Sequence, residues 1–377
     1  MPSIQKRPDG RWRARYRDPA GREHARHFAR KIDAQRFLDG IASAMLSGAY
    51  VDPARARVTV GEWSARWLDG VQVKPSTRAT YESLLRCHVL PTWGDVPLSG
   101  VTHADVSAWT AKLASSGLAP ATVRQTHRVL SLLLGLAVRD GRMPRNPAHG
   151  APLPRSAPSG KRFLDHRQVS ELADAAATQR PEYGLAVRVL ALCGLRFGEL
   201  AALRVGRVDL LRRRLEVAES ITEVNGRAVF GTPKNNTPRS VPVPRSLADG
   251  LAQLMAGKTP DALVFTAPEG GVLLLRNFRR RAFNPACLAA GLDGLTPHDL
   301  RHTAASLAVA AGANVKAVQR MLGHASAAMT LDIYSGLFDD DLDGVAERLE
   351  AASADSLADS VRTGAPVVGL DGHRASR

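Results

Sequence analysis

Hydrophobic and polar residues alternate in the first part of the chain with the period of two that is typical of a β-strand. One face of this stretch carries Trp12, Ala14 and Tyr16, and the other carries Arg11, Arg13, Arg15 and Arg17. A tight turn at residues 18–21, a second strand from Arg22 to Phe28 and a helix from about Asp33 follow. Residues 1–55 therefore predict a small basic α+β module.

From about Thr59 the apolar positions repeat with helical spacing, in four stretches that end near residue 141. Ser76, Thr102 and Pro120 stand at N-cap or N1 positions, and Gly117 and Gly141 stand at C-terminal stops. The pattern predicts an all-α bundle over residues 59–146. Residues 147–162 are basic and rich in Pro, Gly and Ser, which is typical of a linker between domains.

The third region, residues 163–345, has a mixed pattern, and we expect a mainly helical α+β domain there. Two strand-like stretches surround Asn225-Gly226, a dipeptide that favours a hairpin turn. The helices are expected at residues 166–179, 181–192, 245–255, 274–290, 297–311, 315–322 and 327–334. Residues 346–377 form a weakly patterned tail.

Length and composition narrow the function. The chain has 377 residues, enough for two or three domains, and its hydrophobic content is 44%. No apolar run reaches the length of a membrane span, and the first residues resemble no signal peptide. The three cysteines are far apart and fit neither a disulfide framework nor CxxC metal spacing. These features favour a soluble, cytoplasmic protein.

The charge balance favours a polyanionic partner. Lys and Arg number 51 against 36 Asp and Glu, a formal net charge of +15. An Arg-rich composition from a GC-rich genome is the alternative, but residues 1–37 alone hold eleven Lys/Arg and four Asp/Glu. Nucleic acid is therefore the expected partner. The residues expected to contact DNA are Arg11, Arg13, Arg15 and Arg17 in the first module and Arg78, Arg86, Arg124 and Arg128 in the bundle.

The stretch GLTPHDLRHTAAS, residues 294–306, crowds His298, Arg301 and His302 into the start of a helix. Two histidines four residues apart could hold a metal ion. A histidine and an arginine three apart share a face and could hold a phosphate. Asp299 fits a capping box with Thr296 and is too short for the general base of a zinc site. The helix start and Arg301 therefore favour an anion over a metal.

Other stretches supply residues of the same chemistry. Arg196 follows a helix break at Gly194, with Glu199 one turn later, where it can orient the arginine. Lys234 is expected in a polar turn between two apolar strands, His324 at a helix end, and Tyr334 ten residues further on. Each of these residues alone also fits an ordinary structural role.

Their order along the chain resembles the tyrosine recombinase (phage integrase) family. GLRFGEL is similar to its first arginine box, LTPHDLRHTAAS to its H-x-x-R box, and LGHASAAMTLDIYSGL to the box that carries the nucleophile. Cys193 stands where threonine is commoner. The six residues that this resemblance makes catalytic are Arg196, Lys234, His298, Arg301, His324 and Tyr334.

The resemblance implies a mechanism. Tyr334 would attack a DNA phosphate and form a 3′-phosphotyrosyl bond, with Arg196 and Arg301 on the non-bridging oxygens. His298 would accept a proton near the tyrosine, His324 would bind the phosphate, and Lys234 would protonate the leaving 5′ oxygen. Because the ester conserves the bond energy, no ATP, metal or other cofactor is expected.

The resemblance also implies partners: core and arm attachment sites in double-stranded DNA, and self-association to a tetramer on DNA. A host DNA-bending protein, a directionality factor, the attachment sequences and the element of origin stay open. A host chromosome-resolution recombinase, a type IB topoisomerase and a DNA-binding regulator without catalysis are the alternatives. The basic N-terminal module favours an integrase encoded by a mobile element.

Residues 338–360 hold eight acidic residues and one basic residue. Leu342, Val345 and Leu349 recur at helical spacing, so a helix with one apolar face is expected. It can pack on its own domain or dock on a neighbouring protomer, and the sequence leaves both open.

Overall fold

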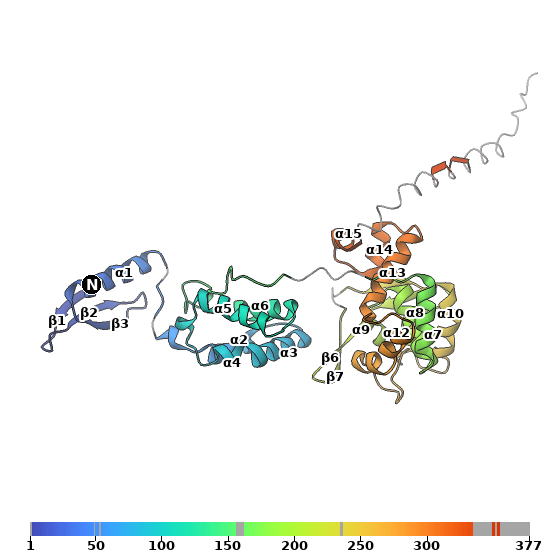
Figure 1. The fold of residues 1–377 in the computed structure, drawn as a ribbon, viewed down its shortest axis with the longest axis horizontal. Helices are drawn as coiled ribbons and strands as arrows, with labels where there is room; N and C mark the ends of the chain where they lie inside the picture. Colours follow the sequence, from blue (N-terminus) through green and yellow to red (C-terminus); the bar gives the residue numbers. More distant parts are fainter. Residues whose placement is uncertain are drawn as a thin grey trace, which may run out of the picture. The chain divides into compact units, whose positions relative to one another are not determined.

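A computed structural model gives the fold of the chain (Figure 1). It describes residues 2–48, 50–52, 54–155, 162–233, 237–334, 349–350 and 353–354. The chain divides into two compact units, residues 1–159 and residues 160–377. No helix of the described residues is long and apolar enough to cross a membrane. Lys234 and nearly all of the acidic stretch 338–360 lie outside the described residues.

The first unit begins with a three-stranded antiparallel sheet of β1 (Ser3–Lys6), β2 (Trp12–Arg17) and β3 (Glu23–Phe28). Helix α1 (Lys31–Leu46) packs on one face, where Ala14 and Tyr16 are buried against Ala34 and Leu38. The alternation in β2 therefore forms as the sequence predicts. Strand β1 was not predicted, because its four residues are too few to show a period.

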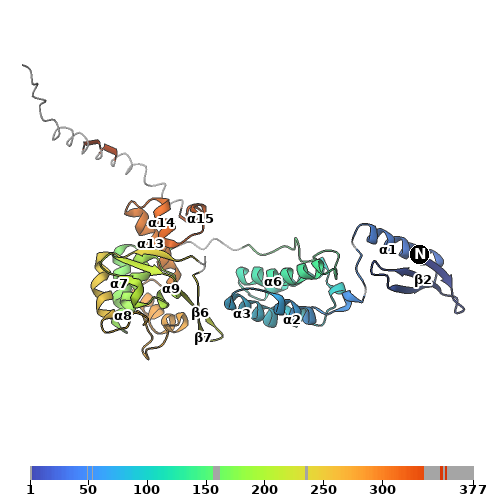
Figure 2. The same cartoon turned by 180° about the vertical axis from the view of Figure 1, so that it is seen from behind.

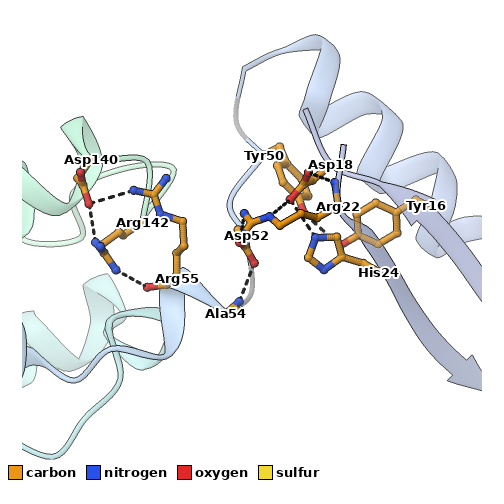
Figure 3. A network of polar contacts seen from close by, with 10 residues as sticks. All are labelled: Tyr16, Asp18, Arg22, His24, Tyr50, Asp52, Ala54, Arg55, Asp140 and Arg142. Atoms are coloured by element: carbon orange, nitrogen blue, oxygen red, sulfur yellow. Dashed lines mark hydrogen bonds and ion pairs between the residues drawn. The ribbon is translucent and has the colours of Figure 1, made fainter. Parts of the chain in front are cut away.

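The segment that leaves this module is fastened to the sheet by a polar network (Figure 3). The Arg22 guanidinium contacts Asp18 at 3.1 Å and Asp52 at 2.5 Å. His24 Nε2 lies 3.0 Å from Asp18, and this hydrogen bond is the main reason that the pKa of Asp18 falls to about 2. Asp18, His24 and Asp52 lie close enough to hold a metal ion, but Arg22 already pairs both carboxylates.

The same segment is then fastened to the helical part of the first unit. Arg142 donates to the backbone oxygen of Arg55 at 3.1 Å, and both arginines pair with Asp140 (Figure 3). Ala56, next to Arg55, is buried. Both ends of the connection are thus held by ion pairs.

The helical bundle of the first unit follows the predicted periodicity. Its elements are η1 (Arg55–Arg57), α2 (Val60–Gly70), α3 (Pro75–Leu84), η2 (Leu85–Val89), α4 (Leu90–Trp93), η3 (Leu98–Gly100), α5 (His103–Ser115) and α6 (Pro120–Arg139). Its core is built around Trp63, Trp67, Trp93 and Trp109 with leucines of α6. Thr102 caps α5 and Pro120 is N1 of α6, as expected. The N-cap expected at Ser76 is wrong, because Lys74 occupies it and Pro75 is N1.

The first half of the expected linker, residues 147–162, packs onto this bundle. His103 and His127 are hydrogen-bonded to the backbone oxygens of Pro147 and Ala148 at 2.9 and 2.8 Å. Thr110 donates to Pro152. The composition predicted a linker between domains, and in its first half polar side chains of the bundle bind its carbonyl groups.

The second unit is mainly helical, with two small sheets (Figure 2). Its elements are α7 (His166–Ala177), α8 (Pro181–Cys193), α9 (Phe197–Ala201), η4 (Val205–Arg207), β4 (Val208–Asp209), β5 (Arg214–Val217), β6 (Ser220–Val224), β7 (Arg227–Gly231), β8 (Arg239–Pro242), η5 (Arg245–Leu247), α10 (Ala248–Met255), α11 (Leu275–Phe278), η6 (Arg279–Phe283), α12 (Asn284–Ala289), α13 (Pro297–Ala310), α14 (Val315–Leu322) and α15 (Ala327–Tyr334). Every helix expected in this region up to residue 334 is present, with small shifts at the ends.

One sheet of the second unit has the strand order β4-β5-β8, and the other is the β6–β7 hairpin. Asn225 and Gly226 form its turn with φ values of 51° and 79°, as a type I′ turn requires. The hairpin extends from the body of the unit (Figure 1). Strands β7 and β8, which flank the segment containing Lys234, belong to different sheets.

Candidate active site

Helix α13 begins with the capping box that the sequence predicts. The Asp299 carboxylate accepts hydrogen bonds from the backbone N–H and the hydroxyl of Thr296, at 2.8 and 2.7 Å. Pro297 occupies the first helical position. This box fixes the start of the helix, and with it the positions of His298, Arg301 and His302 in its first turns.

Arg301 points into the protein and is 2% exposed. Its terminal nitrogens donate to the backbone oxygens of Gly194, at the end of α8, and Leu322, at the end of α14. Carbonyl groups at helix C-termini lack partners within the helix and attract cations. A Cβ atom at Gly194 would lie 2.7 Å from the Leu322 side chain, so glycine lets the two helix ends meet around the guanidinium.

Two further arginines, Arg196 and Arg239, contact Glu199, which is 2% exposed. Its carboxylate accepts one hydrogen bond from the Arg196 side chain at 2.9 Å and two from Arg239, at 2.9 and 2.7 Å. Burial alone raises the pKa of Glu199, but Arg239 and then Arg196 outweigh it and leave the pKa below its usual range. The hydrogen bond from the Arg196 side chain to Glu199 agrees with the expectation that Glu199 orients this arginine.

Arg239 joins this site although the sequence analysis did not single it out. It begins β8, in the stretch TPKNNTPRSVPVP, where the sequence pointed only to Lys234. Its Nε also donates to the backbone oxygen of Met321 at 2.9 Å, which ties the sheet to α14. The one signal in the sequence was an arginine entering an apolar strand that leads out of a polar turn.

These residues form what we call the guanidinium cluster: Arg196, Arg239 and Arg301 around the single carboxylate of Glu199. Burial lowers the pKa of Arg301 to about 9, and the charge of Arg196 acts in the same direction. A cavity of about 480 Å³ opens beside the cluster and is lined by Arg196, Arg239, Lys316, Arg320 and His324 among others. Excess positive charge around a cavity attracts an anion such as a phosphate.

Tyr334 ends α15 and is 2% exposed. Its hydroxyl lies 2.8 Å from His302 Nδ1, and its ring is parallel to that of His324 with the centroids 6.3 Å apart. Burial raises the pKa of Tyr334 to about 12, although the nearby charge of Arg301 acts in the opposite direction. Helices α13, α14 and α15 meet at one end of the second unit, which brings these residues together (Figure 1).

His324 follows Gly323, the left-handed C-cap of α14, with φ of 66°. Its Nδ1 lies 3.0 Å from the Thr330 hydroxyl. Burial lowers the pKa of His324 to about 4, and the charges of Arg301 and Arg196 lower it further. The imidazole is therefore neutral at pH 7 and can donate one hydrogen bond to a phosphate.

The two histidines of α13 are arranged differently from each other. His298 is exposed at the helix start, with its ring 5.0 Å from that of His302 and nearly perpendicular to it. The proton acceptor beside Tyr334 was expected at His298, whereas the residue hydrogen-bonded to the tyrosine hydroxyl is His302. Among the described residues, no third metal-binding side chain joins the two histidines in a cluster.

The second unit thus brings together four of the six expected catalytic residues: Arg196, Arg301, His324 and Tyr334. His298 contacts the ring of His302, which lies between it and Tyr334, and Lys234 is outside the described residues. Of the arginines expected on DNA, Arg13, Arg15 and Arg17 lie on the sheet face opposite α1, and Arg11, Arg86, Arg124 and Arg128 are exposed. Arg78 is partly committed, because it pairs with Glu82 and donates to the backbone oxygen of Leu68.

Comparisons with known proteins show the family of the chain. The model of the phage integrase family matches residues 162–340. Models of a phage integrase N-terminal domain and of a phage integrase N-terminal SAM-like domain match residues 3–47 and 59–114.

The chain is 28% identical to the integrase of Mycobacterium phage D29 over 349 residues, covering 87% of this chain and 91% of that integrase. It is 30% identical to the integrase of Mycobacterium phage FRAT1, covering 74% and 84% of the two chains. A tyrosine recombinase XerC of Corynebacterium efficiens is 31% identical, with 68% and 79% covered.

Solved structures share the fold. The Tn1549 transposon integrase in complex with transposon right end DNA gives a TM-score of 0.67 at 21% identity, covering 78% of this chain and 100% of that one. A lambda integrase dimer bound to a core site gives 0.58 at 20% identity, covering 91% and 96%.

A buried tyrosine beside His302 and His324, within reach of the charge of Arg301, stands here on the fold of the tyrosine site-specific recombinases, a class of enzyme that breaks and rejoins DNA strands. Within that class, the chain belongs to the phage integrase family, as the matching family models and the coverage of its relatives establish.

The guanidinium cluster predicts a large effect of Glu199→Gln. Loss of the buried carboxylate leaves Arg239 and Arg196, whose side chains are 10% and 23% exposed, without their counter-charge, and breaking a buried pair in this way costs about 3–5 kcal/mol. We expect that loss in the free energy of unfolding of the second unit. Far-UV circular dichroism should be used, because all five tryptophans lie at or before residue 109.

The matched control is Glu216→Gln in the same unit. Glu216 pairs with Arg207, and both side chains are about half exposed, at 48% and 49%. Exposed pairs contribute about 0–1 kcal/mol. Equal stability of the two variants would contradict the structural role of Glu199.

His324 predicts a pH dependence of stability. Its pKa is about 4 in the folded protein against 6.5 for an unperturbed histidine, so the unfolded chain binds the proton more readily. The stability that this group contributes is complete above pH 6.5 and is lost as the pH falls toward 4. In His324→Gln, the denaturant concentration at the unfolding midpoint should therefore change less between pH 7 and pH 5 than it does in the wild type. An unchanged slope in the variant would refute the assignment.

Proposed function

We propose that this recombinase integrates and excises a mobile genetic element such as a prophage, with Tyr334 as its nucleophile. The observation that carries the proposal is the burial of Tyr334 beside His324, which lines a cavity of about 480 Å³ together with Arg196, Arg239, Lys316 and Arg320. Arg196 lines this cavity, and we infer from the resemblance to the family that it and Arg301 contact the non-bridging oxygens of a bound phosphodiester. Bidentate guanidinium contacts would stabilise the charge of the pentacoordinate state.

The reaction then runs without a supply of energy. Attack by Tyr334 forms the 3′-phosphotyrosyl ester and releases the 5′ oxygen. This oxygen receives a proton from Lys234, the expected general acid. A neutral His324 donates a hydrogen bond to the bound phosphate. Rejoining reverses these steps with the 5′ hydroxyl of another strand, so the ester carries the bond energy and no ATP is consumed.

The division of labour that we propose has three DNA-facing parts. Residues 1–55 bind arm-type sites. The helical domain, residues 59–146, and the catalytic domain, residues 163–345, bind the core site and are joined by residues 147–162. Residues 346–377 form the tail. Arg13 and Arg15 lie on the central strand of the N-terminal sheet, on the face that α1 leaves uncovered. A bivalent protein of this kind binds one site more tightly when it occupies the other.

A tetramer on DNA completes the proposal. Among the proteins of similar fold, lambda integrase forms a tetramer bound to a Holliday junction. A host-type chromosome-resolution recombinase is the second candidate, since XerC proteins are among the relatives. The match of residues 3–47 to a phage integrase N-terminal domain favours the integrase.

Tyr334→Phe should separate binding from chemistry. Incubation of the wild-type protein with a nicked core site should attach it covalently to a 3′ phosphate, in the presence of excess EDTA as well as without it. The variant should bind the same DNA and trap nothing, because the ring keeps its packing but loses the attacking oxygen. Cleavage that survives in the variant, or that a chelator abolishes, would rule out this mechanism.

Arg13→Ala combined with Arg15→Ala should weaken arm-site binding and lower its salt slope by about two, because each arginine that no longer binds a phosphate lowers the slope by about one. Core-site cleavage should be unchanged. The charge-matched control is Arg30→Ala with Arg36→Ala, two exposed residues at and within α1. If the control weakens arm binding as much as the first pair does, the sheet face is not the surface that binds DNA.

A further inference from the structure

Of His298, Arg301 and His302 at the start of α13, His302 is the residue to which the resemblance to the family assigns no catalytic part. It lies one helical turn after His298 on α13 and is less exposed. Its Nδ1 atom is 2.8 Å from the Tyr334 hydroxyl, a normal hydrogen-bond distance, although the two residues are 32 positions apart in the sequence. The contact therefore depends on the packing of α13 against α15.

The Tyr334 hydroxyl needs a proton acceptor at this position. Its burial raises the pKa of Tyr334 to about 12, so very little phenolate exists at neutral pH. Arg301 has hydrogen-bond donors only and cannot accept the proton. His324 lies parallel to the tyrosine ring, and its Nδ1 is occupied by Thr330. Phe163, the remaining aromatic neighbour, is apolar.

Within the part of the chain that the structure describes, His302 is the hydrogen-bond partner of this hydroxyl. We propose that His302 is a catalytic residue that accepts the proton of Tyr334 during strand cleavage and returns it during rejoining. The inference rests on the proposed role of Tyr334 as the nucleophile. It places the proton acceptor at His302 and not at His298, which is exposed and contacts the ring of His302.

The proton and the electrons balance in this step. The O–H bond of Tyr334 breaks and its proton passes to His302 Nδ1, while the phenolic oxygen forms a bond to phosphorus. The bond from phosphorus to the 5′ oxygen breaks, and that oxygen takes a proton from the general acid. On rejoining, the attacking 5′ hydroxyl returns its proton to the general acid and its oxygen bonds to phosphorus. The phenolic oxygen leaves phosphorus and recovers its proton from His302.

His302→Asn tests the proposal, because an asparagine side chain reaches the Nδ1 position and can hydrogen-bond the hydroxyl without acting as a base. General base catalysis contributes about 100-fold to 10,000-fold to a rate. We expect a loss of that size in the single-turnover rate of covalent complex formation on a nicked core site, with unchanged DNA binding. A wild-type or faster rate would overturn the proposal.

A core site with sulfur in place of the bridging 5′ oxygen separates the two ends of the reaction. A thiolate leaves without being protonated, so a defect at the leaving group disappears and a defect at the nucleophile persists. The loss in His302→Asn should keep its full size on this substrate. Recovery of the wild-type rate would mean that His302 serves the leaving group, and would overturn the proposal.

The dependence of the rate on pH gives a second readout. Without the acceptor, Tyr334 must ionise by itself, so the rate of the variant should climb between about pH 7.5 and 9.5, where that of the wild type is level. The titratable and charged groups around His302 are His298 and Arg301 on its own helix, Tyr334 on α15 and His324 after α14. Parallel profiles would contradict the assignment.

Two further variants give the controls. His166→Asn removes an exposed histidine of α7 and should leave the rate unchanged. His298→Asn should cost less than His302→Asn; the opposite order would make His298 the acceptor and overturn the proposal. Failure of the proposed function would show differently, as the absence of any covalent complex with the wild-type protein.

Discussion

The buried carboxylate of Glu199 is the interaction on which the site depends. A guanidinium can be removed from water only if something compensates its charge, and here one carboxylate serves both Arg196 and Arg239. Arg301 donates to two backbone carbonyl groups, and the charge of Glu199 acts on it without a direct hydrogen bond. The result is a cluster that is stable enough to fold and still positive enough to bind a phosphate, which is the balance that phosphoryl transfer requires.

Helix ends supply the geometry. The end of α8 at Gly194 and the end of α14 at Leu322 converge on Arg301, and the same glycine break allows Arg196 to open α9. Gly323 then turns the chain so that His324 meets the tyrosine of α15. Elements from three parts of the second unit therefore contribute to a site that no single stretch of sequence contains.

The sequence could predict those features that repeat or that stand in a recognisable frame. The capping box of Thr296 and Asp299, the hairpin at Asn225 and the nucleophile box around Tyr334 are all local. Arg239 escaped because its role arises from a contact with Glu199 forty positions away, and periodicity carries no information on such pairing. The contact of His302 with Tyr334 could not be predicted for the same reason, since the distance between the two residues is set by helix packing. The contacts of the Pro-rich stretch after residue 146 could not be predicted either, because its carbonyl groups bind bundle side chains that are distant in the sequence.

The most direct test of the account is the identity of the residue that carries the DNA. Tryptic digestion of the covalent complex should yield the peptide of residues 321–348, which contains a single tyrosine, Tyr334. Mass spectrometry after nuclease treatment should find the remaining nucleotide on this peptide, attached to Tyr334 through its 3′ phosphate. A nucleotide on any other peptide, or attachment through a 5′ phosphate, would contradict the account.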